Sequence, residues 1–162
     1  MSEPAEDPQE LAALRNEIDE VEREVVRTVD LGPRAVVIAA AVFVLIVGLV
    51  LPWMGGANGL EVLLGQHEAV GKASWVPRLF ATTSIGFGVL GSALAIITRR
   101  WALTWVCALG GWFASVDGVL AIWSRQSSAG PGASAPGIGL IIAEIATVVI
   151  ASLWFRTAWS RS

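Results

Sequence analysis

The sequence has few charged residues, and most of them lie near its beginning. Charged residues make up 15% of the 162 positions and hydrophobic residues 54%, with a mean hydropathy of +0.64. A soluble domain usually carries about 25% charged residues. A soluble fold of this size cannot bury so much apolar surface. The composition therefore predicts an integral membrane protein.

Residues that carry most enzymatic and metal chemistry are also scarce. Cys107 is the only cysteine, which excludes an intramolecular disulfide and a cysteine-based metal site. His67 is the only histidine, and its spacing to Glu61 and Glu68 does not match a known set of metal ligands. The sequence has no nucleotide-binding loop, nucleophile elbow, metalloprotease helix or haem-attachment motif. We therefore predict no bound metal, no cofactor and no enzymatic activity.

The first 34 residues form an acidic segment with ten acids and four arginines. This negative charge argues against binding to nucleic acid or docking on anionic lipid. Asp7 and Pro8 form a good helix start, and Gly32 and Pro33 are typical of a helix end, so we expect a helix over 8–30. Apolar residues repeat along it at heptad spacing, at Leu11, Leu14, Ile18, Val21 and Val25.

The charges beside this heptad pattern decide what the helix is expected to bind. In a parallel homodimer Glu17 would face Glu22, and like charges repel. The pattern therefore favours a more basic protein partner, or docking of the helix on the cytoplasmic face of its own chain. A solvated helix without a fixed partner is the alternative.

Four apolar stretches follow, each long enough to cross a hydrocarbon core of about 30 Å. They cover about 35–53, 79–98, 102–123 and 137–155 within a predicted membrane domain over 35–162. Eight arginines fall on the side of the N-terminus and three basic residues on the other side. The positive-inside rule then places both termini in the cytoplasm of a multi-pass plasma-membrane protein. Six tryptophans fall near the expected interfaces, namely Trp53, Trp75, Trp101, Trp123, Trp154 and Trp159.

Small residues four positions apart predict how the spans pack, because lipid provides no hydrophobic force between helices. They occur in the second, third and fourth spans, at Ser84, Gly88, Ser92, Gly110, Ala114, Gly118, Gly139, Ala143, Thr147 and Ala151. The first span is bulkier. We therefore expect the last three spans to pack tightly and the first to lie at the periphery of a four-helix bundle.

Two carboxylates lie inside the predicted spans, Asp117 in the third and Glu144 in the fourth. Both are roughly 9–11 Å below the outer boundary at 1.5 Å per residue, and Ser84, Thr83 and Ser115 lie at a similar depth. An ionised carboxylate at such depth is costly, so these residues form a candidate functional layer. It would serve a proton or cation path, join helices through protonated carboxyls, or pair with a basic residue of a partner.

The acidic first helix, the Leu-Pro-Trp at 51–53 and the Gly- and Trp-rich later spans resemble small four-span membrane proteins of actinobacteria. This architectural resemblance implies no activity and no functional residues. The sequence thus predicts an all-α integral membrane bundle, preceded by a cytoplasmic amphipathic helix, that acts without enzymatic activity as an accessory subunit or scaffold. A small transporter and an envelope-stress sensor are the alternatives. The expected partners are the lipid bilayer and a protein or second copy, without nucleic acid.

Overall fold

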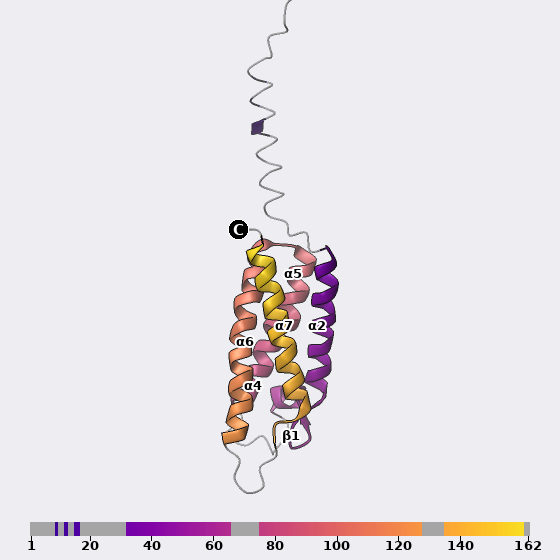
Figure 1. The fold of residues 1–162 in the computed structure, drawn as a ribbon, viewed down its shortest axis with the longest axis vertical. Helices are drawn as coiled ribbons and strands as arrows, with labels where there is room; N and C mark the ends of the chain where they lie inside the picture. The colour runs from indigo at the N-terminus through magenta and orange to yellow at the C-terminus, as the bar shows by residue number, and fades with distance from the viewer. Residues whose placement is uncertain are drawn as a thin grey trace, which may run out of the picture.

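The computed structural model describes residues 9, 12, 15, 16, 32–65, 75–127 and 135–160. Long helices stand side by side with alternating direction, and the first of them begins at the end of the bundle where the last one ends (Figure 1). The helical segments are α2 (Gly32–Val50), the continuous run of α4 (Trp75–Thr83), η1 (Ser84–Gly91) and α5 (Ser92–Thr98), α6 (Trp101–Ser127) and α7 (Ile138–Trp159). The all-α class predicted from the sequence is confirmed.

Helix boundaries differ from the expected ones where proline is present. Gly32 and Pro33, expected just ahead of the first span, form the first turn of α2. Proline suits a first turn because its missing N–H would have no partner there, and Pro77 lies in the first turn of α4 for the same reason. The predicted helix over 8–30 lies largely outside the described residues. So do its heptad positions, Leu11, Leu14, Ile18, Val21 and Val25.

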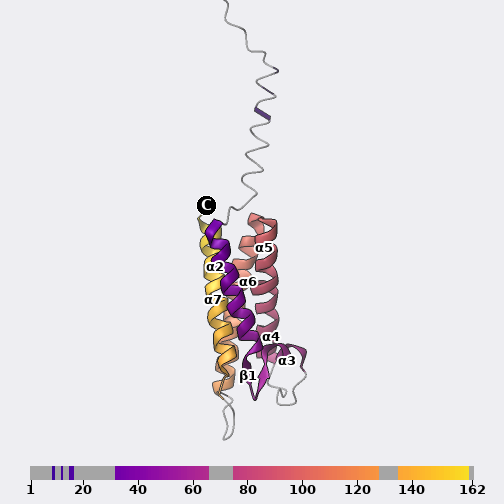
Figure 2. The ribbon, with the colours of Figure 1, turned by 90° about the vertical axis from the view of Figure 1, so that its right-hand side faces the viewer.

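A short hairpin and helix close one end of the bundle (Figure 2). Strand β1 (Pro52–Met54) pairs antiparallel with β2 (Ala57–Asn58). Gly55 and Gly56 make the tight turn between them, with φ of 54° and 88°, values that glycine adopts readily. Helix α3 (Gly59–Leu64) follows, and Asn58 and Glu61 cap its start reciprocally. Glu61 thus has a structural role as a helix cap.

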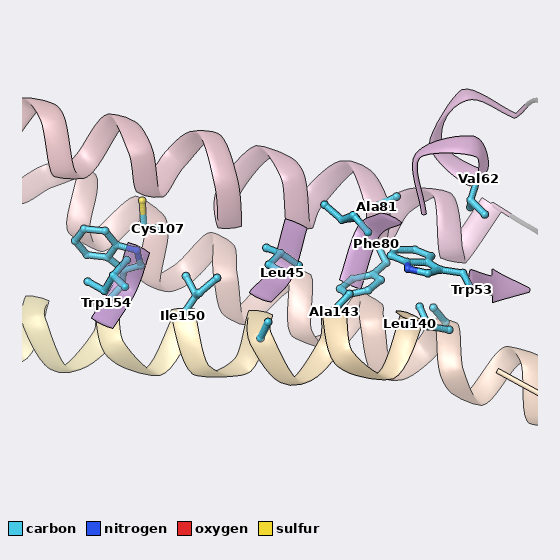
Figure 3. Packing of buried hydrophobic residues seen from close by; sticks show 14 of the residues in the cluster. Leu45, Trp53, Val62, Phe80, Ala81, Cys107, Leu140, Ala143, Ile150 and Trp154 are labelled. Atoms are coloured by element: carbon cyan, nitrogen blue, oxygen red, sulfur yellow. The ribbon is translucent and has the colours of Figure 1, made fainter. Parts of the chain in front are cut away.

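Two tryptophans expected at membrane interfaces are instead fully buried, Trp53 and Trp154, each 0% exposed. They lie towards opposite ends of the core (Figure 3). The Trp53 ring stacks on Phe80 with 5.4 Å between centroids, and its Nε1 donates to the Gly48 carbonyl at 2.8 Å. Nε1 of Trp154 donates to Ser92 Oγ at 2.9 Å. The expectation fails because a partner for each indole N–H exists inside the bundle.

The small residues of the last three spans are all buried, which confirms the predicted packing surfaces. The first span is the least buried of the four, as expected of a more peripheral helix, but α7 packs extensively against both α6 and α2. A Cβ on Gly48 of α2 would lie 2.8 Å from the backbone nitrogen of Ala143, so these two backbones are in close contact. Gly139 of α7 contributes to the same contact, because a Cβ there would lie 2.8 Å from the Gly48 carbonyl oxygen.

The outer surface of the bundle is apolar. Large hydrophobic side chains are exposed along every long helix, including Val36 on α2, Ile97 on α5, Phe113 on α6 and Ile145 on α7. Within the described residues, four helical segments are long and apolar enough to cross a membrane, judged by length and composition alone. Exposed tryptophans lie towards both ends, at Trp75, Trp101, Trp123 and Trp159.

Candidate functional site

Three residues of the predicted polar layer come from three different helices. Thr83 ends α4, Asp117 lies on α6 and Glu144 lies on α7. The Thr83 hydroxyl donates to Asp117 Oδ2 at 3.2 Å and also reaches the Leu79 carbonyl at 3.0 Å. The carboxylate is the charged acceptor and therefore the stronger one. The Thr83–Asp117 hydrogen bond thus connects α4 to α6.

Glu144 is buried without a hydrogen-bond partner for its carboxyl group. Its side chain is 6% exposed, and neither Oε1 nor Oε2 has a partner. The carboxyl group lies directly against Gly118, the residue that follows Asp117 on α6. A Cβ at Gly118 would collide with the Glu144 carboxyl and come within 2.8 Å of the Phe80 ring. Glycine at 118 therefore makes room for the carboxyl group.

The two serines of the predicted layer do not join this group. Ser84 Oγ donates to the Ala81 carbonyl at 3.2 Å, and Ser115 Oγ donates to the Gly111 carbonyl at 3.0 Å. Both serines are buried, and both bond within their own helical segments. The buried group is therefore Thr83, Asp117 and Glu144, with Gly118 and Phe80 as its apolar neighbours. Sequence reasoning identified Gly118 only as a packing residue and did not identify Phe80.

Thr83 lies at the point where the helix changes from α to π geometry. The π-helical stretch η1 begins at the next residue, Ser84, and contains three glycines, Gly86, Gly88 and Gly91. Such stretches are rare and often occur at functional sites. Here the wider turn starts where the side chain of Thr83 crosses to Asp117.

The described residues contain no group of three or more His, Cys, Asp or Glu side chains that could hold a metal ion. His67 and Glu68 lie outside the described residues. Cys107 is buried and free of a disulfide. Asp117 and Glu144 are the acidic residues that are buried in the described part of the bundle.

A family model for the MiaB C-terminal domain matches residues 15–162. The chain belongs to this family. A tRNA-2-methylthio-N(6)-dimethylallyladenosine synthase from Mycobacterium avium (strain 104) is 44% identical to it over 158 residues, which are 97% of the chain and 22% of that protein. The chain therefore spans about a fifth of the length of this relative. No solved structure matches the chain.

Membership of the MiaB C-terminal domain family corrects the predicted recognition and function. The resemblance to small four-span actinobacterial membrane proteins named the wrong family. The non-enzymatic accessory subunit or scaffold, the transporter and the stress sensor are all contradicted, because the relative is named as a synthase. The prediction that no enzyme is involved is wrong for the same reason. Those predictions came from missing catalytic motifs, which is weak evidence in a chain about a fifth as long as its relative.

The predicted partners and location are corrected by the same finding. The prediction that nucleic acid is not a partner is contradicted for this family, because the relative is named for a modified adenosine of tRNA. The predicted partners were the lipid bilayer and either another protein or a second copy of the chain. This prediction is therefore contradicted as well. The multi-pass plasma-membrane location with both termini in the cytoplasm is contradicted as well, because the matching names describe a tRNA-modifying enzyme and its domain.

Proposed function

We propose that the chain works as the C-terminal domain of an enzyme that makes 2-methylthio-N(6)-dimethylallyladenosine in tRNA. The observation that carries this proposal is the 44% identity to the named synthase over 97% of the chain. The described residues provide a buried carboxyl pair and a buried thiol, and among them no group of three or more His, Cys, Asp or Glu side chains could hold a metal ion. Within such an enzyme, we assign the chemical step to the larger remainder of the protein and a supporting role to the bundle.

The test is to delete residues 32–160 in cells that make the chain and to measure the modified nucleoside in digested tRNA by mass spectrometry. We expect the 2-methylthio form to fall and N(6)-dimethylallyladenosine without the methylthio group to accumulate. Cells with a Gly86→Ala chain are the matched control, because a Cβ at this position meets nothing within 4 Å. An unchanged ratio of the two nucleosides in the deletion strain would contradict the proposal.

We also propose the finer architecture that the sequence predicts, in which lipid surrounds the helical bundle. This part of the proposal concerns the domain alone. It is supported by the apolar outer surface and by helical segments long enough to cross a hydrocarbon core. Exposed tryptophans towards both ends, such as Trp75 and Trp159, add support because indole rings favour the boundary between lipid and water. It implies neither a particular membrane nor an orientation of the chain.

Phase partition tests this architecture. The purified chain is mixed with a nonionic detergent that separates from water on warming, and in parallel with phospholipid vesicles that are floated and then washed at alkaline pH. We expect the chain in the detergent phase, and in the vesicles after the wash. A monomeric chain that stays in the aqueous phase would show that its apolar surface needs no lipid.

A further inference from the structure

The carboxyl group of Glu144 lies where an ionised form would be poorly stabilised. Both oxygens are inaccessible and without a hydrogen-bond donor. Burying a charge without a partner costs several kcal/mol or more, so such a group is normally neutral or paired. The close contact with Gly118 places the carboxyl group against the backbone of α6, where a Cβ at Gly118 would also lie 2.8 Å from the Phe80 ring.

Asp117 is the acidic residue beside Glu144 on the neighbouring helix. It lies one residue before Gly118, which the Glu144 carboxyl contacts, it is 4% exposed, and it interacts electrostatically with Glu144. The two acids differ in their surroundings, because the Thr83 hydroxyl donates to Asp117 whereas nothing donates to Glu144. A donated hydrogen bond favours the ionised form of a carboxyl group. The geometry therefore makes Asp117 the acceptor and Glu144 the carrier of a proton.

We propose that Glu144 and Asp117 share one proton, and that this proton bridge fastens α7 to α6. The bridge satisfies Glu144 with an acceptor on the facing helix and leaves one negative charge, which Thr83 helps to stabilise. Two carboxyl groups that share a proton titrate as a pair. The bundle therefore contains a contact between helices that is present only while the proton is bound.

The other elements packed around the bridge contribute no competing charge at this depth. Helix α2 has Arg34 in its first turn as its only charged residue, and η1 and α5 have none. On α4 the one charged residue is Arg78, which is exposed. Beyond the pair itself, α6 carries Arg125 in its last turn and α7 carries Arg156 in its last turn.

The sign of the pH dependence follows from where the proton is bound. Both carboxyl groups of the unfolded chain lose their protons at acidic pH, whereas the folded pair keeps one proton to higher pH. The folded state thus binds more protons, and its stability falls as pH rises through the titration of the pair. Glutamine at 144 replaces the carboxylic acid with an amide, which donates to Asp117 at any pH.

The experiment measures the thermal unfolding of the full 162-residue chain in one detergent, by loss of helical circular dichroism, from mildly acidic to alkaline pH. We expect the midpoint of the unmodified chain to fall with rising pH and that of Glu144→Gln to show a much smaller shift. Glu61→Gln is the matched control, because Glu61 belongs to the cap at the start of α3 and not to the carboxyl pair, and this variant should keep the pH dependence. A midpoint equally insensitive to pH in the unmodified chain and in Glu144→Gln would overturn the proposal.

A second measurement does not depend on how well the variant folds. Infrared spectra of the unmodified chain should show a protonated carboxyl band at neutral pH that disappears at alkaline pH. Absence of this band at neutral pH would overturn the proposal.

A third measurement compares the unfolding midpoint in sodium or calcium chloride with the midpoint in choline chloride at equal ionic strength. A midpoint that rises with either metal ion in the unmodified chain but not in Glu144→Gln would show a bound cation in place of the proton.

Discussion

Two of the buried polar contacts between helices differ in how completely their polar groups are satisfied. Near the end of the bundle where α2 begins and α7 ends, the Trp154 indole donates to Ser92 Oγ at 2.9 Å. In the half that faces the hairpin, Thr83 donates to Asp117 while the carboxyl group of Glu144 has no donor. The first contact joins two neutral groups and needs nothing else. The second joins two acids, and its strength therefore depends on a proton.

This difference shows why burial alone does not define a polar residue's role. Trp154 and Glu144 lie on the same helix and are both buried. The tryptophan contributes a large apolar surface and one satisfied N–H, so we expect it to stabilise the bundle under all conditions. The glutamate contributes little apolar surface, and its contribution depends on its protonation state.

The largest expected effect comes from removing the satisfied contact altogether. Trp154→Ala should lower the free energy of unfolding by about 3–5 kcal/mol, because a large buried side chain leaves a cavity. Thermal or denaturant unfolding of the full chain in one detergent measures the loss. Trp112→Ala is the control, because Trp112 is exposed on the same bundle and should cost far less. Equal losses would mean that the interior around Trp154 is not tightly packed.

A smaller effect should follow from crowding the unsatisfied contact. Gly118→Ala places a methyl group against the Glu144 carboxyl and the Phe80 ring, and overpacking of this kind costs about 1–3 kcal/mol. The same unfolding assay applies, with Gly86→Ala as the control because a Cβ there meets nothing within 4 Å. If Gly118→Ala were as stable as the control, the contact between Glu144 and α6 would have to be looser than the structure shows.

The smallest effect should come from deleting one hydrogen bond and leaving the packing in place. Ser92→Ala removes the acceptor of the Trp154 N–H and should cost about 1 kcal/mol, the lower end of the penalty for a buried donor without an acceptor. It should not change with pH, since neither group titrates near neutrality. Ser152→Ala is the control, because the Ser152 hydroxyl donates only to the Val148 carbonyl of its own helix. A pH-dependent loss in Ser92→Ala would remove the distinction between the two contacts.

Apolar length and spacing made the helices and their small packing surfaces predictable. The same patterns could not show which tryptophans are buried, because an indole ring suits both a polar boundary and a core with an N–H acceptor. They also missed α2 as a close neighbour of α7, since the single Gly48 carries no repeated motif. Asp117 and Glu144 could be placed at similar depth from residue counts. The absence of a donor for Glu144 depends on three-dimensional packing and could not be read from the sequence.

The function was predicted wrongly for a different physical reason. The composition of a chain indicates which solvent surrounds it, and the composition of this chain is dominated by apolar helices. The link to tRNA modification rests on identity along the chain and not on any residue pattern in it. An acidic segment and a lack of catalytic motifs were therefore poor guides to the family to which the chain belongs.

The antiparallel pair α2 and α7 is fastened at both ends. Arg34 Nη1 donates to Ser160 Oγ at 3.2 Å at one end, and the Gly137 N–H donates to the Trp53 carbonyl at 2.7 Å at the other. Because Gly32 and Ser160 lie at the same end, tension between them would load the Arg34–Ser160 contact first (Figure 1). The two helices would then separate progressively from that end, one layer of side chains at a time. Less force would thus be needed to separate the helices by pulling at Gly32 and Ser160 than to slide them past each other along their axes.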